Sequence, residues 1–167
     1  NQAVVADWML IDGPESASAF AAALLDKPRQ AYGRNAIGAA LLEGLRLMET
    51  NDFDGWRRVI DFSGDSANNW NGPPIEEARQ TVLAAGVTIN ALPILRPDDP
   101  GRAQGGLEAL YEERIIGGPG AFVVTAESRA SFAEAVKRKL ILEISGVVPE
   151  RQLAKTGPET GRITSKP

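Results

Sequence analysis

The stretch RRVIDFSGDSANN, residues 57–69, decides the fold class of this chain. Its residues 59–62 are apolar except for Asp61, and they predict a short, largely buried strand. A polar loop of small side chains follows at residues 63–69, and a pair of prolines then suits the first turn of a helix. In an open α/β sheet, ligands bind at the loops that leave the carboxyl ends of the strands. We therefore expect the functional site in this loop.

The loop after this strand carries a concentrated set of oxygen donors: Asp65, Ser63, Ser66, Asn68 and Asn69. Carboxylate, hydroxyl and amide oxygens are hard ligands, which suit Mg²⁺ or Ca²⁺ better than zinc. Asp65 is the first candidate, because it is the one carboxylate among them. The structural alternative is a turn aspartate that bonds its own backbone, beside asparagines that tolerate a left-handed turn.

Hydrophobic periodicity elsewhere alternates between strand and helix patterns. The expected strands are residues 3–10, 57–62, 87–95 and 121–125. The expected helices are residues 16–25, 37–48, 75–85 and 107–113, with a further helix within 127–144. Strands that alternate with helices predict an α/β fold, in which a parallel sheet has helices on both faces.

Two helices carry specific expectations about single residues. Asn35 precedes the helix at 37–48 and is predicted to cap its amino end. The last helix repeats an apolar residue at every fourth position, which predicts the face that packs on the core: Phe132, Val136, Leu140 and Ile144. The basic run at residues 137–139 is assigned to the solvated side of that helix.

Composition excludes several classes of function. The chain has 167 residues, which suits one domain with a real core. It has no cysteine and no histidine, which excludes disulfides, thiolate chemistry, Ser-His catalysis and imidazole metal ligands. A net charge of -4 without a basic stripe argues against nucleic acid as a partner. No apolar run is long enough to span a bilayer.

Three motifs in order, VIDFSGDSANNWNGPP, INALPIL and IIGGPGAFVV, carry a family resemblance. They resemble a bacterial branch of proteins of unknown function that is similar to the von Willebrand factor A (vWA) domain. The strand with Ser-Gly-Asp is similar to the third metal-site loop of the vWA fold, where an aspartate helps to hold a divalent cation. The resemblance implies a Rossmann-like, vWA-like parallel sheet for residues 1–147. Residues 148–167 are polar without periodicity and are predicted to form a flexible tail.

The resemblance also implies site residues. The metal ligands would be Asp65, Ser63 and Asn35, and Asn35 stands where the vWA pattern has a threonine. In such domains the cation keeps an open position for an acidic group of a protein partner, whose identity the sequence does not name. The residues beside this loop that are expected to contact the partner are Asn68, Asn69 and Trp70.

One part of the vWA pattern is missing from the chain. Its Asp-x-Ser-x-Ser sequence, which follows the first strand of the domain and supplies most of the cation ligands, occurs nowhere here. By resemblance, the chain begins at about the third strand. We expect a complementing N-terminal segment of the same domain, in a cleaved fragment or a separate chain, because a gap in the sheet leaves backbone groups unpaired. Many proteins of this branch carry an export signal, so the expected location is extracellular or periplasmic.

Three functions follow from these observations. The first is a non-enzymatic vWA-like adhesion or protein-binding module, which uses Mg²⁺ or Ca²⁺ at the carboxyl edge of the sheet to bind an acidic group. The alternative is a Mg²⁺-dependent phosphoryl or ester hydrolase on a Rossmann-like sheet, with Asp61 or Asp65 on the metal and at least one more carboxylate beside it. The third is a metal-free structural domain. No catalytic residue is assigned.

The remaining polar and aromatic residues receive structural interpretations. Asp61 lies within its strand and is expected to pair with Arg57, Arg58 or a missing segment. Trp8 and Trp56 are expected to pack at sheet edges, whereas Trp70 is the best candidate for an exposed aromatic side chain.

Overall fold

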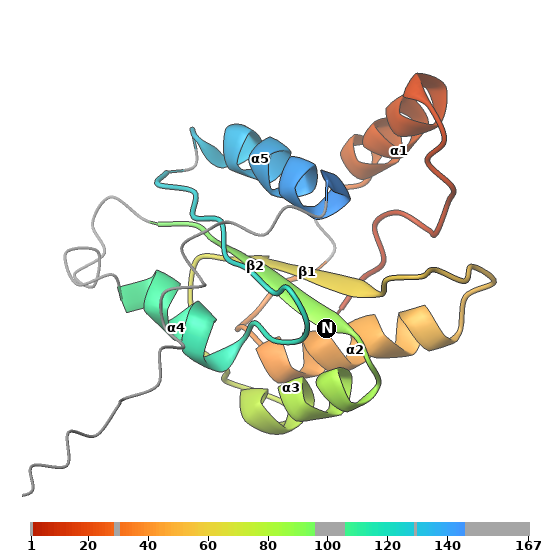
Figure 1. Ribbon diagram of the computed structural model, residues 1–167. Coiled ribbons are helices and arrows are strands. Elements are labelled where there is room, and N and C mark those ends of the chain that lie inside the picture. Colours follow the sequence, from red (N-terminus) through yellow and green to blue (C-terminus); the bar gives the residue numbers. More distant parts are fainter. Residues whose placement is uncertain (1, 29–30, 96–105, 129, 146–167) are drawn as a thin grey trace, which may run out of the picture.

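The computed structural model describes residues 2–28, 31–95, 106–128 and 130–145. The chain folds as a mixed α/β structure, with a small sheet between layers of helices (Figure 1). Its elements, in order, are α1 (Pro14–Asp26), α2 (Ile37–Glu49), β1 (Val59–Gly64), α3 (Ile75–Ala84), β2 (Thr88–Pro93), α4 (Gly106–Arg114) and α5 (Phe132–Ser145). Helices α2 and α3 lie on one face of the sheet and α5 lies on the other (Figure 1). The predicted α/β class is therefore confirmed.

The sheet has two parallel strands, β1 and β2. Val59 pairs with Thr88 at one end and Gly64 pairs with Pro93 at the other. On its far side, β2 meets the segment 117–126 through single bridges at Ile89, Ala91 and Ile94. The described residues thus order the sheet as β1, β2 and then this segment.

Two of the four predicted strands are wrong. Residues 3–10 are not a strand, because no neighbouring strand in the described part of the chain pairs with them. Residues 121–125 contribute only isolated bridges. Pro93 explains part of this, since it has no N–H to donate to a continuing ladder, although its carbonyl still accepts a hydrogen bond from Ala126 at 2.9 Å.

The core is centred on β2, whose six residues are all buried. Its larger part lies between the sheet and α2, α3 and α4, and includes Leu41, Val82 and Tyr111. A smaller part on the opposite face joins Leu92 and residues 122–126 to α5. Burial on both faces explains why β2 reads as an unbroken apolar run in the sequence.

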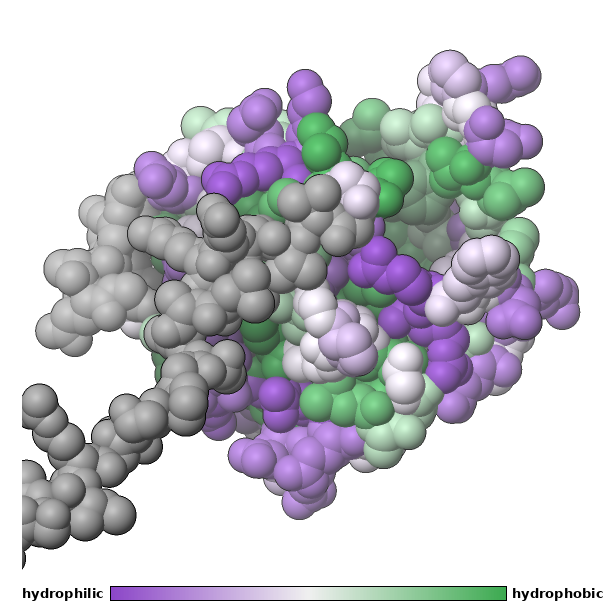
Figure 2. All heavy atoms as spheres, viewed as in Figure 1, coloured by the Kyte–Doolittle hydropathy of each residue, from purple (hydrophilic) through white to green (hydrophobic). Residues whose placement is uncertain are grey.

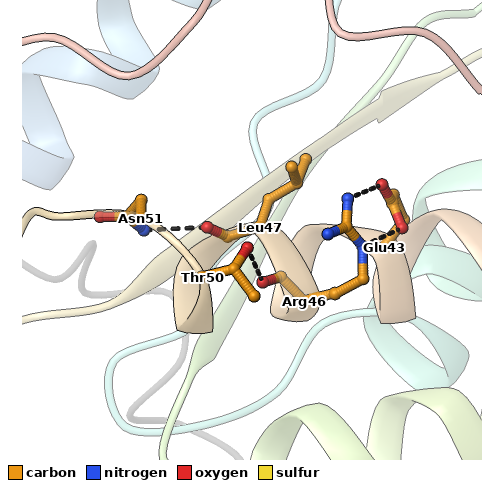
Figure 3. Close-up of polar contacts among 5 residues, drawn as sticks. All are labelled: Glu43, Arg46, Leu47, Thr50 and Asn51. Carbon is orange, nitrogen blue, oxygen red and sulfur yellow. Dashed lines mark hydrogen bonds and ion pairs between the residues drawn. The ribbon is translucent and has the colours of Figure 1, made fainter.

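The carboxyl end of α2 is closed by side chains that bond its last free carbonyls (Figure 3). The Thr50 hydroxyl donates to the Arg46 carbonyl at 2.8 Å, and the Asn51 amide donates to the Leu47 carbonyl at 2.9 Å. Arg46 also makes a paired hydrogen bond with Glu43 one turn earlier, at 2.8 and 2.6 Å. Because the helix ends here, the chain can turn back toward β1.

Helix α5 corrects two predictions about its faces. Lys139, assigned to the solvated side, is only 3% exposed, and its ammonium forms an ion pair with the Asp61 carboxylate of β1. Asp61 therefore pairs with neither of the two predicted arginines. Of the predicted apolar face, Leu140 and Ile144 are exposed at 45% and 84%. Phe132 and Val136 of the same predicted face do pack against the core, so the prediction is wrong only for the second half of the helix, where Lys139 faces the sheet.

Two tryptophans also differ from their expected packing. Trp56 is fully exposed and Trp8 is about half exposed, so neither is buried at a sheet edge.

In the described part of the chain no helix is both long and apolar enough to cross a bilayer. The predicted tail at residues 148–167 lies outside the described residues.

Candidate functional site

Two loops that are distant in the sequence meet at the carboxyl end of β1. The Trp70 N–H donates to the Asn35 carbonyl at 2.9 Å. The Arg34 guanidinium lies over the Trp70 ring, 4.9 Å from its centroid. These contacts join the loop that follows β1 to the loop that precedes α2, and they place a cation and an aromatic ring side by side on the surface.

The side chain of Asn69 also connects the loop that follows β1 to the amino end of α2. Its side-chain oxygen accepts a hydrogen bond from the Gly38 N–H at 3.3 Å, and its side-chain nitrogen donates to the Pro73 carbonyl at 2.9 Å. Both ends of its amide are thus used within the chain. Asn69 holds the loop against the amino end of α2, which fixes where the neighbouring Trp70 lies.

The prediction that Asn35 caps α2 is wrong. The capping position belongs to Ala36, which makes no side-chain bond there. Asn35 precedes the capping residue by one position. Its backbone carbonyl instead accepts the hydrogen bond from the Trp70 N–H. An N–H in the first turn is instead satisfied from a distance, by the amide of Asn69.

A cavity of about 460 Å³ opens beside this junction. Its lining comes from the amino end of the chain, residues 31–36, the first turn of α2 and the turn after Trp70: Gln2, Ala31, Tyr32, Gly33, Arg34, Asn35, Ala36, Ala39, Ala40, Asn71 and Gly72. Its size falls in the usual range of small-ligand sites. The polar side chains of Tyr32, Arg34 and Asn35 give it groups that can bind charged or hydrogen-bonding ligands.

Asp65 lies directly after β1, in a loop supported from below by Tyr111. The Tyr111 hydroxyl donates to the Ser66 carbonyl at 3.0 Å. Burial raises the pKa of this hydroxyl, the bond to Ser66 partly offsets the rise, and the nearby charge of Asp65 adds to it. Gly64 leaves room for this contact, since a Cβ there would lie 2.8 Å from the Tyr111 oxygen. The loop that carries Asp65 is therefore built on a buried tyrosine.

The family whose description is "Protein of unknown function (DUF1194)" matches residues 1–148. The chain belongs to this family. The match spans α1 to α5, both strands and both loops of the junction. No curated protein and no solved structure matches the chain.

Within this DUF1194 domain, the predicted site residues fall into two neighbouring groups. Ser63 and Asp65 lie at the carboxyl end of β1 and just beyond it. Asn35 lines the cavity, and Trp70 covers the junction with 59% of its surface exposed. Asn68 is exposed between the two groups, and its N–H donates to the Ser66 hydroxyl at 3.1 Å.

The donor set does not complete a cation site by itself. Among the described residues, no three acidic side chains are placed to share a metal ion. Magnesium and calcium take about six or more oxygen ligands, usually with more than one carboxylate in an all-protein site. Asp65 with neutral oxygens therefore amounts to part of such a site, and further ligands would have to come from another segment or a partner.

Sequence reasoning missed Arg34 and Tyr111 as parts of this site. Arg34 lies in the loop before the helix at residues 37–48, and the only signal that could have indicated it is that binding residues are often found on loops. Tyr111 lies in the helix expected at residues 107–113, and no pattern in the sequence singles it out. Its role follows only from the fold, because the Ser66 carbonyl that it bonds is 45 residues away in the sequence.

Proposed function

We propose that this DUF1194 domain is a vWA-like protein-binding module, which uses the junction at the carboxyl end of β1 to bind an acidic group of its partner. The observation that carries the proposal is Arg34 stacked on an exposed Trp70 whose backbone is tied to Asn35. Tryptophan and arginine are the residue types that most often dominate binding energy at protein interfaces.

The geometry of the junction suits binding without large rearrangement. Trp70 is held through its backbone and through its neighbour Asn69, so little conformational freedom remains to be lost on binding. Arg34 stays charged at all ordinary pH values and presents a planar fork that matches a carboxylate. Exposed Asn68 and the cavity beside Asn35 extend the surface that a partner would contact.

A divalent cation belongs to the proposal as a second contribution. Asp65 would supply the carboxylate, with Ser63 and Asn35 as further oxygen donors. The remaining ligands would come from a complementing N-terminal segment of the same domain, which the resemblance to the vWA pattern implies. Extracellular or periplasmic location is part of the same proposal.

The test uses the indole N–H signals of the three tryptophans in two-dimensional NMR spectra. The probe is a short peptide of alternating glutamate and glycine, and the matched control peptide has glutamine at every glutamate. We expect the glutamate peptide to shift the Trp70 signal, identified by its loss in Trp70→Phe. Arg34→Gln should remove the shift, whereas Lys137→Gln on α5 should leave it unchanged.

The cation contribution is measured in the same titration. Millimolar MgCl₂ should tighten peptide binding in the parent protein if Asp65 holds the ion, and Asp65→Ala should remove that gain. Peptide binding that is unaffected by Arg34→Gln would contradict the proposed role of the junction.

A further inference from the structure

We propose that the open edge of β1 is a docking site for an extended apolar segment from outside these 167 residues, which adds to the sheet as a parallel strand. This inference deepens the protein-binding role proposed above and rests on the complementing segment included there. It is argued from the backbone and side chains of β1 and its surroundings.

The backbone of β1 alternates between a paired side and an open side. The Arg58 carbonyl accepts a hydrogen bond from the Thr88 N–H at 3.0 Å, and the Gly64 carbonyl accepts one from the Ile94 N–H at 2.8 Å. Because successive residues of a strand point their backbone groups in opposite directions, the even-numbered residues from 58 to 64 face β2. The odd-numbered residues Val59, Asp61 and Ser63 face the other way.

The backbone groups on that other side have no partner among the described residues. In the described part of the chain, β1 pairs with β2 alone, and no strand or bridge meets its outer edge. By contrast, β2 is bonded on both sides, for example by Ile89 and Ala91 to residues 117–124. Three N–H groups and three carbonyls in one row are the pattern that an added strand would satisfy.

Exposed apolar side chains lie near the amino end of this edge, beside charged ones. A groove of about 560 Å³ lies at the amino end of β1, where Val59 is the one residue of this strand that lines it. Its apolar lining comes from residues 8–11, Met48, Phe53 and Ile144, and its polar and charged lining from Asn51, Asp54, Arg57, Arg58 and Glu143. Leu140 and Ile141 of α5 are also exposed. Figure 2 shows apolar surface around the hollow between α5 and α1. Helix α1, all of whose residues are described, has no buried residue.

These features together select a strand as the occupant. Helices cannot satisfy a row of unpaired strand groups, because their own backbone groups are bonded internally. An added strand would lie between α5 and α1 on one face and α2 on the other, so apolar side chains on both of its faces would be buried. The two strands present are parallel, and a sheet covered by helices on both faces is typically parallel throughout.

Hydrogen exchange of the 167-residue chain measures the edge directly. In dilute protein we expect the amides of Ile60, Phe62 and Gly64 to exchange at least about 100-fold more slowly than those of Val59, Asp61 and Ser63. The probe is a lysine-flanked peptide with a core of alternating valine and threonine, as long as the six residues of β1. At millimolar concentration it should slow exchange at the three odd-numbered amides by about tenfold. The same peptide methylated on every backbone nitrogen should not.

A matched pair of variants tests the geometry. Val59→Pro removes one open-edge N–H and leaves the bonds to β2 intact, so it should weaken peptide binding about three- to tenfold. Val59→Thr keeps the N–H and should bind as the parent does. Arg34→Gln should leave edge protection unchanged, which separates failure at the edge from failure at the acidic-group site.

Three results would overturn the inference. Protection of the odd-numbered amides at every dilution, without peptide, would mean that the chain covers its own edge. Protection that appears only as the protein concentration rises would mean that a second copy is the occupant. Absence of protection by the peptide would mean that the edge does not accept a strand.

Discussion

Replacing Gly38 by alanine should destabilise the protein, whereas the same change at Gly44 in the same helix should not. Gly38 lies in the first turn of α2 where the backbone of Pro73 and Pro74 passes very close. A Cβ at this position would overlap the Pro73 carbonyl oxygen, which is fixed backbone. A Cβ at Gly44 would lie 3.1 Å from the end of the Ile60 side chain, which can move by a few tenths of an ångström.

The magnitude follows from three effects at Gly38. Overpacking against backbone costs about 1–3 kcal/mol. Displacement of the helix end also weakens the hydrogen bond from the Gly38 N–H to Asn69, which is worth about 1 kcal/mol. The higher helix propensity of alanine returns at most about 1 kcal/mol. The net expectation is a loss of about 1–3 kcal/mol for Gly38→Ala, and for Gly44→Ala a result between no change and a gain of about 1 kcal/mol.

Urea denaturation followed by far-ultraviolet circular dichroism gives both values under the same conditions. The midpoint should fall for Gly38→Ala and stay or rise for Gly44→Ala, with the same slope against urea in both variants. Peptide binding at the Trp70 junction should also weaken in Gly38→Ala, because Asn69 links that glycine to the loop. Equal stability of the two variants would refute the close approach of α2 to residues 73–74 and, with it, the positioning of the site.

Three further changes test other contacts. Burial lowers the pKa of Lys139 to about 8, from the ordinary value of 10.5. Between these two pH values Lys139 is protonated in the unfolded chain but largely neutral in the folded one, so the unfolded chain binds more protons. The free energy of unfolding should therefore rise by about 1–2 kcal/mol from pH ~8 to pH ~9.5 in the parent protein relative to Lys139→Met, measured by urea denaturation. Tyr111→Phe leaves the Ser66 carbonyl without its hydrogen bond and should cost about 1–2 kcal/mol in thermal denaturation. Asn69→Ala removes two hydrogen bonds and should cost about 1–2 kcal/mol, whereas Asn68→Ala should stay within about 0.5 kcal/mol.

Each of these has a control or an outcome that would contradict it. Lys137→Met removes an exposed charge from the same helix and should leave the pH dependence of stability as in the parent. A parent protein whose stability falls relative to Lys139→Met over this pH window would reverse the expected sign. Tyr111→Phe as stable as the parent would show that the buried hydroxyl does not support the loop, and equal losses for the two asparagines would show that Asn69 has no special role.

Local sequence patterns were sufficient for most of the elements. The predicted helix at residues 37–48 is observed as α2, and the strands expected at 57–62 and 87–95 are observed as β1 and β2. These segments have strong periodicity or continuous β-branched character, bounded by prolines and glycines, so their conformation is decided by near neighbours. The strand predicted at residues 3–10 had equally good local character, but a strand also needs a partner, and the described residues give it none.

The sequence by itself determined the α/β class, the helix and strand segments with strong patterns, and the polar loop after β1 as the place to look for a site. Only the tertiary structure decided which charges are buried and which loops meet. Lys139 looks solvated in a basic run, yet it is buried beside Asp61, because the side of α5 that faces the sheet depends on contacts with residues far away in the sequence. Arg34 and Trp70 come together for a similar reason: the backbone bond between their loops joins residues that no local pattern relates. Short-range preferences fix elements, whereas pairing across the fold fixes the site.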